Sequence, residues 1–147
     1  MTTGMMIIAL ILVSAGYLIS IYFYLATHNR IPTAVPWLPS LVQIGDCRCE
    51  ELVDTPFGRT LGRSNAFWAM WYFVFLAIAI ISTNLNSWPG VTTLFFITLI
   101  AFARSIYLAW ALLLMRVVCR PCITAHIINL GLILIFGYLE WPKLFPG

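Results

Sequence analysis

Charge is the scarcest property of this sequence. Of its 147 residues only 9% are charged, while 62% are hydrophobic and the mean hydropathy is +0.97. A soluble globular domain with a polar surface is therefore excluded. The eight basic residues are scattered among the ends of apolar segments instead of forming a stripe, so we expect no nucleic-acid partner. What remains is an integral membrane protein, whose first partner is membrane lipid.

Apolar segments long enough to cross a bilayer occur four times. A crossing helix needs about 20 mostly apolar residues to span a hydrocarbon core of roughly 30 Å. The first segment lacks a basic residue before it and a small-x-small cleavage pattern after it, which indicates a retained helix rather than a signal peptide. We predict an all-α membrane protein, a four-helix transmembrane bundle in which residues 1–147 form a single domain. The predicted spans are about 5–26, 66–83, 91–115 and 120–139.

The segment 27–64 is the one substantial extramembrane part that we predict. Four prolines interrupt it, and it holds four of the five acidic residues of the chain. It is also rich in apolar side chains, so we expect this loop to lie along the membrane interface as a lid over a site.

The four cysteines form two close pairs, Cys47 with Cys49 and Cys119 with Cys122. In a four-span topology the first and third loops lie at one membrane face, and these two loops carry the pairs. We therefore predict a membrane-embedded thiol–disulfide relay with all four cysteines as catalytic residues. The C-x-C disulfide closes a very small ring and should be easily reduced, which is typical of a shuttle.

The C-x-x-C pair stands at the predicted start of the fourth span. There the helix dipole and nearby arginines favour a thiolate, and we expect Cys119 to face solvent and exchange with other thiols. Cys122 lies about 4.5 Å deeper along the helix axis, where it can meet a lipid-soluble oxidant.

Two other interpretations of the cysteines stay open. Buried free cysteines are common in membrane helices, although two pairs that converge on one face are improbable as mere packing. The stronger alternative is a zinc-stabilised membrane scaffold that binds about one metal per chain through all four thiolates. Zinc sites seldom use C-x-C as one half, so we favour a metal-free redox site.

The segments 104–110 and 119–129 resemble the third and fourth helices of the vitamin K epoxide reductase family. Thr55, after the loop cysteines, and Asn65, near the second span, also follow that family's order. The resemblance implies a bundle around a quinone of the menaquinone, ubiquinone or phylloquinone type. It further implies that electrons pass from a thioredoxin-like partner through Cys47 and Cys49, then through the C-x-x-C pair to the quinone.

Microbial members of this family oxidise protein dithiols and reduce a membrane quinone, as DsbB-type enzymes do. The expected function is therefore a quinone-linked thiol oxidase that makes disulfides in a thioredoxin-like or DsbA-like protein supplied in trans. The alternative within the fold is reduction of a vitamin K quinone or epoxide with thiols as the reductant. The chain departs from the family in separating its loop cysteines by only one residue.

Cys122, His126 and Asn129 are spaced i, i+4 and i+7 and share one helix face. In the family a tyrosine commonly occupies the place of His126 and hydrogen-bonds a quinone carbonyl, as does the asparagine matching Asn65. We expect Asn65, His126, Asn129 and Thr55 to bind the quinone. Simpler roles stay open, namely a bond from His126 to a backbone carbonyl and capping of the second span by Asn65.

Arginines raise two further questions. Arg104 lies near the middle of the third predicted span, and no acidic residue lies in any predicted span. Its partner could be a carbonyl, the quinone, or a lipid phosphate at the opposite surface. The six other arginines all accompany the cysteines. We expect a cell-membrane protein, and the positive-inside rule favours an orientation in which the cysteines face the cytoplasm, against the usual family orientation.

Overall fold

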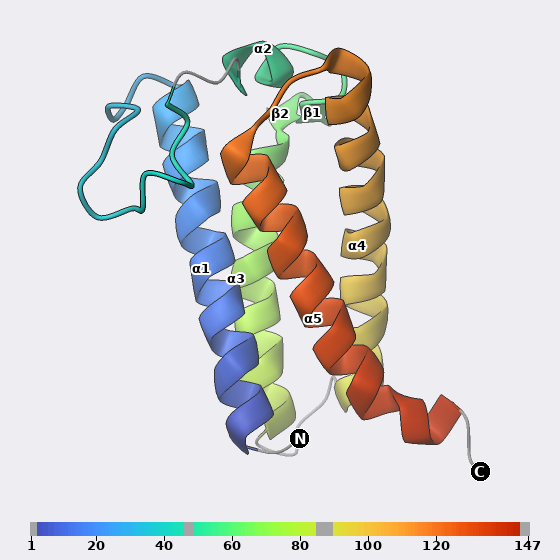
Figure 1. Cartoon of the computed structure of the whole chain (residues 1–147). Coiled ribbons are helices and arrows are strands. Elements are labelled where there is room, and N and C mark those ends of the chain that lie inside the picture. Colours follow the sequence, from blue (N-terminus) through green and yellow to red (C-terminus); the bar gives the residue numbers. More distant parts are fainter. Residues whose placement is uncertain (1–2, 46–48, 85–89, 145–147) are drawn as a thin grey trace.

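Four long helices dominate the structure, a computed structural model that describes residues 3–45, 49–84 and 90–144 (Figure 1). All four are long and apolar enough to cross a membrane, which confirms the predicted fold class and number of spans. Their bounds are α1 (Thr3–Thr27), α3 (Asn65–Asn84), α4 (Gly90–Met115) and α5 (Arg120–Leu144).

The helices pack as a bundle around the buried apolar side chains that they share. Helix α1 packs against α3 and α5, and α5 packs in turn against α4. A Cβ atom at Gly16 of α1 would overlap the Phe73 ring of α3, so glycine permits this close approach. The fully buried Tyr22, Leu94 and Phe136 belong to the apolar core along the bundle.

The outer faces of the helices are apolar as well. Large side chains such as Phe75 (64% exposed), Ile100 (72%) and Leu113 (76%) point away from the bundle. A water-soluble protein does not expose apolar side chains on this scale, whereas hydrocarbon is a favourable surrounding for them. The protein is an integral membrane protein.

One end of the bundle is covered by the segment that joins α1 to α3. It contains the short helix α2 (Cys49–Val53) and a two-stranded antiparallel hairpin of β1 (Arg59–Thr60) and β2 (Arg63–Ser64). Both lie at the same end as the start of α5, so Cys49 and the C-x-x-C pair are at one end (Figure 1). Cys47 lies outside the described residues.

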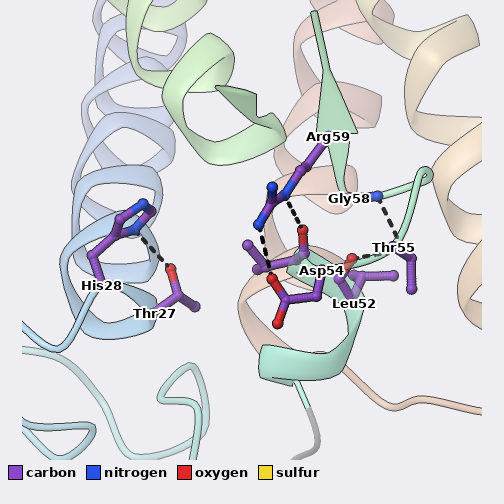
Figure 2. Close-up of polar contacts among 8 residues, drawn as sticks. Thr27, His28, Leu52, Asp54, Thr55, Gly58 and Arg59 are labelled. Atoms are coloured by element: carbon purple, nitrogen blue, oxygen red, sulfur yellow. Dashed lines mark hydrogen bonds and ion pairs between the residues drawn. The ribbon is translucent and has the colours of Figure 1, made fainter. Parts of the chain in front are cut away.

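The turn after α2 is fixed by local hydrogen bonds (Figure 2). The Thr55 hydroxyl donates to the Leu52 carbonyl (2.7 Å) and accepts from the Gly58 amide (3.2 Å). Arg59 pairs with Asp54 at 2.9 Å on the surface. The hairpin then turns at Leu61 and Gly62, which both have positive φ (51° and 77°), as two-residue hairpin loops prefer. These contacts set the position of Thr60.

The fourth span is longer than predicted. Helix α5 continues past residue 139 to Leu144, and it includes Glu140, which is only 4% exposed. The expectation that no acidic residue lies in a span was therefore wrong. The Thr92 hydroxyl of α4 donates to the Glu140 carboxylate at 2.7 Å, which helps to offset the cost of burying it.

Candidate functional site

A cavity of about 540 Å³ lies within the bundle at the cysteine end. This volume is within the range of small-molecule sites. The walls come from all four long helices, and Leu52, Val53, Gly58 and Thr60 of the covering segment also line it. Part of the predicted loop 27–64 therefore encloses the site. The lining is mainly apolar; the cavity-lining polar residues are Ser20, Thr60, Ser64, Asn65, Tyr72, Arg104, Ser105, Cys122, His126 and Asn129.

Cys119 and Cys122 are joined by a disulfide, with their Cα atoms 5.2 Å apart. The Ile123 amide donates to the Cys119 carbonyl at 2.9 Å, and Pro121 occupies the first turn of α5, where its missing N–H costs nothing. Cys122 lines the cavity and Cys119 does not. Of the two cysteines in the C-x-x-C motif, the one deeper along the helix, Cys122, therefore lies at the cavity, as the sequence predicted.

The expectation that Cys119 faces solvent was wrong, because its exposed fraction is 0%. It is buried in an apolar cluster with Cys49, Leu52 and Val117. Helix α2 contributes two members of that cluster, so this short helix covers the C-x-x-C pair, which a helix-start pattern alone cannot reveal.

Cys49 is the first residue of α2, is also 0% exposed, and is disulfide-bonded. It shares the buried cluster with Cys119. The structure therefore brings together three of the four predicted cysteines, Cys49, Cys119 and Cys122, at one end of the bundle. The prediction for Cys47 falls outside the described residues.

His126 lines the cavity one helical turn below Cys122. Both ring nitrogens are buried, and neither has a hydrogen-bond partner among the described residues. The alternative of a bond to a backbone carbonyl is therefore not the arrangement found. A buried polar group without a partner is costly, which makes this ring a candidate for hydrogen bonding to a ligand.

Asn129 lies on the same face of α5 and also lines the cavity. Its Nδ2 donates to the Ser105 hydroxyl of α4 at 2.9 Å, while its Oδ1 is buried without a partner in the described structure. Ser105 thereby fixes which end of the amide is left to accept a hydrogen bond.

Tyr72 of α3 was not predicted as a site residue. Its hydroxyl is buried and lacks a partner among the described residues, and its side chain lines the same cavity. The signal was present in the sequence, because Tyr72 is seven residues after Asn65 and so lies on the same helix face. Tyr72, His126 and Asn129 together leave both hydrogen-bond donors and acceptors available beside apolar walls.

Asn65 is the first residue of α3, and its side chain is held by three hydrogen bonds. Its Oδ1 accepts from the Thr60 hydroxyl (2.7 Å) and from Arg104 Nη2 (3.4 Å), and its Nδ2 donates to the Phe57 carbonyl (2.6 Å). Capping belongs instead to Ser64, whose hydroxyl accepts from the Phe67 amide at 3.3 Å. Asn65 therefore keeps one Nδ2 hydrogen with which it can donate into the cavity.

Arg104 reaches from α4 to the hairpin. Its Nη2 donates to the Thr60 hydroxyl at 2.8 Å, and its guanidinium carbon lies 4.8 Å from the centre of the Tyr107 ring. Of the partners considered from sequence, a carbonyl is found in the form of the Asn65 amide oxygen, which accepts from Nη2 at 3.4 Å, while the quinone and a lipid phosphate stay predictions. The closer partner comes from the hairpin, and only the folded covering segment brings Thr60 within reach.

Thr55 does not line the cavity. Its hydroxyl is engaged in the turn after α2 (Figure 2). Thr60 is the threonine that lines the cavity. As for metals, the residues described include no group of three or more His, Cys, Asp or Glu side chains that could hold an ion.

Comparison with known families identifies residues 6–136 as a match to the vitamin K epoxide reductase family. No curated protein and no solved structure matches the chain. The matched region includes all three described cysteines and every polar residue that lines the cavity. This family is associated with quinones and consists of oxidoreductases. The protein is an integral membrane oxidoreductase that belongs to the vitamin K epoxide reductase family.

Proposed function

We propose that this protein is a quinone-linked thiol oxidase that generates disulfide bonds in a thioredoxin-like or DsbA-like partner, as DsbB-type microbial enzymes do. The observation that carries the proposal is the position of Cys122. One member of a C-x-x-C disulfide lines an apolar cavity, beside polar groups that lack partners. A dithiol at this position can exchange electrons with a planar, lipid-soluble carbonyl compound.

The quinone is a substrate in this proposal, and the cavity fits one. Its apolar walls suit the ring and tail, while His126, Asn65 and Tyr72 can donate hydrogen bonds to carbonyl oxygens. Menaquinone, ubiquinone and phylloquinone types all share these features, so we propose the class and not one member.

The thiol steps follow from the burial of the cysteines. The partner dithiol would reduce the loop pair, and Cys49 would then exchange with Cys119 inside their common apolar cluster. Cys119 is closed to solvent, so external thiols would reach it through the loop pair. Cys122 would pass the two electrons to the quinone, and both S–H protons would go to the quinone oxygens as the Cys119–Cys122 bond forms again.

The natural electron donor and acceptor separate this proposal from its alternative, in which thiols serve only as the reductant for a vitamin K quinone or epoxide. Oxidase function predicts that a protein dithiol is a far better electron donor than a small dithiol. The alternative predicts instead that an epoxide serves as an electron acceptor and that a small dithiol serves as well as a protein dithiol.

The first experiment measures quinone reduction by the detergent-purified, dithiol-reduced protein with menaquinone and ubiquinone analogues. We expect Cys122→Ala to abolish turnover and His126→Ala to lower it. Thr124→Val is a matched control, because Thr124 is on α5 but does not line the cavity. Absence of turnover in the wild type, together with about one bound zinc per chain, would favour the zinc scaffold instead.

We further propose that residues 1–147 form one domain in the cell membrane with the cysteine end facing the cytoplasm. Leu61 at the hairpin turn is 85% exposed and provides a reporter position. In Leu61→Cys, an impermeant maleimide should label the protein in inside-out vesicles and leave intact cells unlabelled. Labelling in intact cells would reverse the orientation.

A further inference from the structure

Arg104 is a cation inside a membrane-spanning helix. It lies 14 residues after the start of α4 at Gly90, or about 21 Å along the axis at the usual helical rise. Charged groups at such positions are costly and normally have an ionic partner. Among residues 3–45, 49–84 and 90–144, no carboxylate pairs with Arg104, and its polar contacts are Thr60 and Asn65.

The guanidinium also has hydrogen-bonding capacity to spare. Both of its hydrogen bonds come from Nη2, and one face is covered by the Tyr107 ring. Its Nε and Nη1 hydrogens have no partner among the described residues, and the Arg104 side chain lines the cavity. A positive group with unused donors therefore lines a mainly apolar cavity, where a charge acts more strongly than in water.

We propose that Arg104 makes this cavity an anion site, which takes a quinone-like ring that bears a negatively charged oxygen. The inference rests on the proposed function and deepens it by naming the charge of the preferred ligand. Two ligands of this kind are an acidic hydroxyquinone in its ionised form and the ring anion produced during quinone reduction.

The positive charge of Arg104 can act during the reduction of the quinone. Oxidation of the Cys119–Cys122 dithiol breaks two S–H bonds, forms one S–S bond and delivers two electrons to the quinone. If one proton arrives before the other, one ring oxygen is negative in the interval. Arg104 stabilises that oxygen by a charge-assisted hydrogen bond, and the second proton then completes the hydroquinone.

The neighbours of Arg104 determine where the negative oxygen lies. The Asn65 Oδ1 is occupied by two donors, so the amide can turn only its Nδ2 hydrogen toward a ligand. Asn65 and Arg104 therefore both donate on the same side of the cavity. An oxygen that accepts from both would carry the negative charge, while the opposite ring oxygen lies toward α5.

The test compares the binding of two probes to the oxidised protein in detergent. The anionic probe is 2-hydroxy-1,4-naphthoquinone, which is ionised at neutral pH, and the neutral probe is 2-methoxy-1,4-naphthoquinone of similar shape. Quenching of tryptophan fluorescence gives both dissociation constants without turnover. We expect the wild type to prefer the anionic probe and Arg104→Met to lose about tenfold in that preference.

Three control measurements test whether the preference for the anionic probe depends on the charge of Arg104. Arg104→Lys should retain part of the preference, because it keeps the charge. Arg63→Met should retain all of it, because the exposed Arg63 contacts the Phe67 ring and does not line the cavity. Affinity of Arg104→Met for the neutral probe should change by less than about threefold, which shows that the cavity still folds.

The outcomes separate this inference from the proposed function. An equal loss for both probes, or an unchanged preference in Arg104→Met, would overturn the anion site even if the wild type reduces quinones. A preference that depends on Arg104 in a protein that reduces no quinone would uphold the anion site and overturn the oxidase function.

Discussion

Two walls of the cavity differ in whether their polar side chains have hydrogen-bond partners within the protein. On the α5 wall, formed by Cys122, His126 and Asn129, the His126 nitrogens and Asn129 Oδ1 lack partners among the described residues. On the hairpin wall, formed by Thr60, Asn65 and Arg104, the side chains bond to one another. The α5 wall is therefore available to a ligand, whereas the hairpin wall is already organised before one arrives.

This difference suggests a division of work. Preorganised donors cost no rearrangement when charge develops, so the hairpin wall suits electrostatic stabilisation. Groups without partners gain most when a ligand binds, so the α5 wall suits recognition and proton transfer close to the reactive sulfur. Substitutions on each wall should consequently affect different measured quantities.

Among substitutions that keep the cysteines, the largest effect is expected from His126→Phe on the α5 wall. The imidazole is the ionisable group nearest to Cys122 along this helix face, and removal of a proton donor commonly lowers a rate by about 100-fold or more. We expect kcat for quinone reduction to fall by about 100-fold, with a smaller change in KM. Stopped-flow measurement of a single turnover would check it. A change in KM alone would limit His126 to ground-state binding.

The next effect is expected from Thr60→Val on the hairpin wall. This change removes the shorter of the two hydrogen bonds to Asn65 Oδ1 and one of the two acceptors of Arg104 Nη2, so only the 3.4 Å contact between Arg104 and Asn65 remains. We expect the free energy of unfolding to fall by about 1–3 kcal/mol and the KM for quinone to rise by about tenfold. Chemical denaturation and steady-state kinetics would measure the two quantities.

Thr60→Ser is the matched control, because it keeps the hydroxyl. Thr60→Ser should keep the KM for quinone close to the wild-type value. A KM as high as that of Thr60→Val would mean that the packing of the Thr60 methyl group matters more than its hydrogen bonds. The double variant Thr60→Val with Asn65→Ala should be hardly worse than Asn65→Ala alone. Full additivity would show that Thr60 does not act through Asn65.

A smaller effect is expected at the link between α4 and α5. Ser105→Ala removes the acceptor for Asn129 Nδ2 and frees the amide to rotate. We expect a loss of about 1 kcal/mol in the free energy of unfolding and a loss of about threefold in quinone affinity. Asn129→Ala should abolish the additional effect of Ser105→Ala. Independent effects of the two substitutions would contradict the proposed fixing of the amide.

The smallest effect on stability, and the only prediction of mixed sign, is expected from Tyr72→Phe. The phenol hydroxyl is buried without a partner in the described structure, so its removal should leave the ligand-free protein as stable or up to about 1 kcal/mol more stable. Quinone affinity should fall by about fivefold if the hydroxyl donates to the ligand. Thermal unfolding with and without quinone measures both, and unchanged affinity would remove Tyr72 from the site.

The two walls also differ in how far they could be predicted. The α5 wall followed from spacing, because residues at i, i+4 and i+7 of one helix share a face whatever the rest of the chain does. The hairpin wall joins residues 44 apart in sequence, as in the Arg104 bond to Thr60. Its geometry depends on the turn after α2, which the hydrogen bonds of the Thr55 hydroxyl hold in place. No local sequence pattern indicates that Thr60, and not Thr55, lines the cavity.

The sequence by itself determined the membrane class, the four spans, the C-x-x-C motif at a helix start and the inward face of α5. These features depend on apolar length and helical periodicity, which act locally. Only the tertiary structure decided that Cys119 is closed to solvent, that Ser64 caps α3 in place of Asn65, and that Arg104 meets the hairpin. The reason is physical, since burial and long-range hydrogen bonds arise only when separate segments pack together.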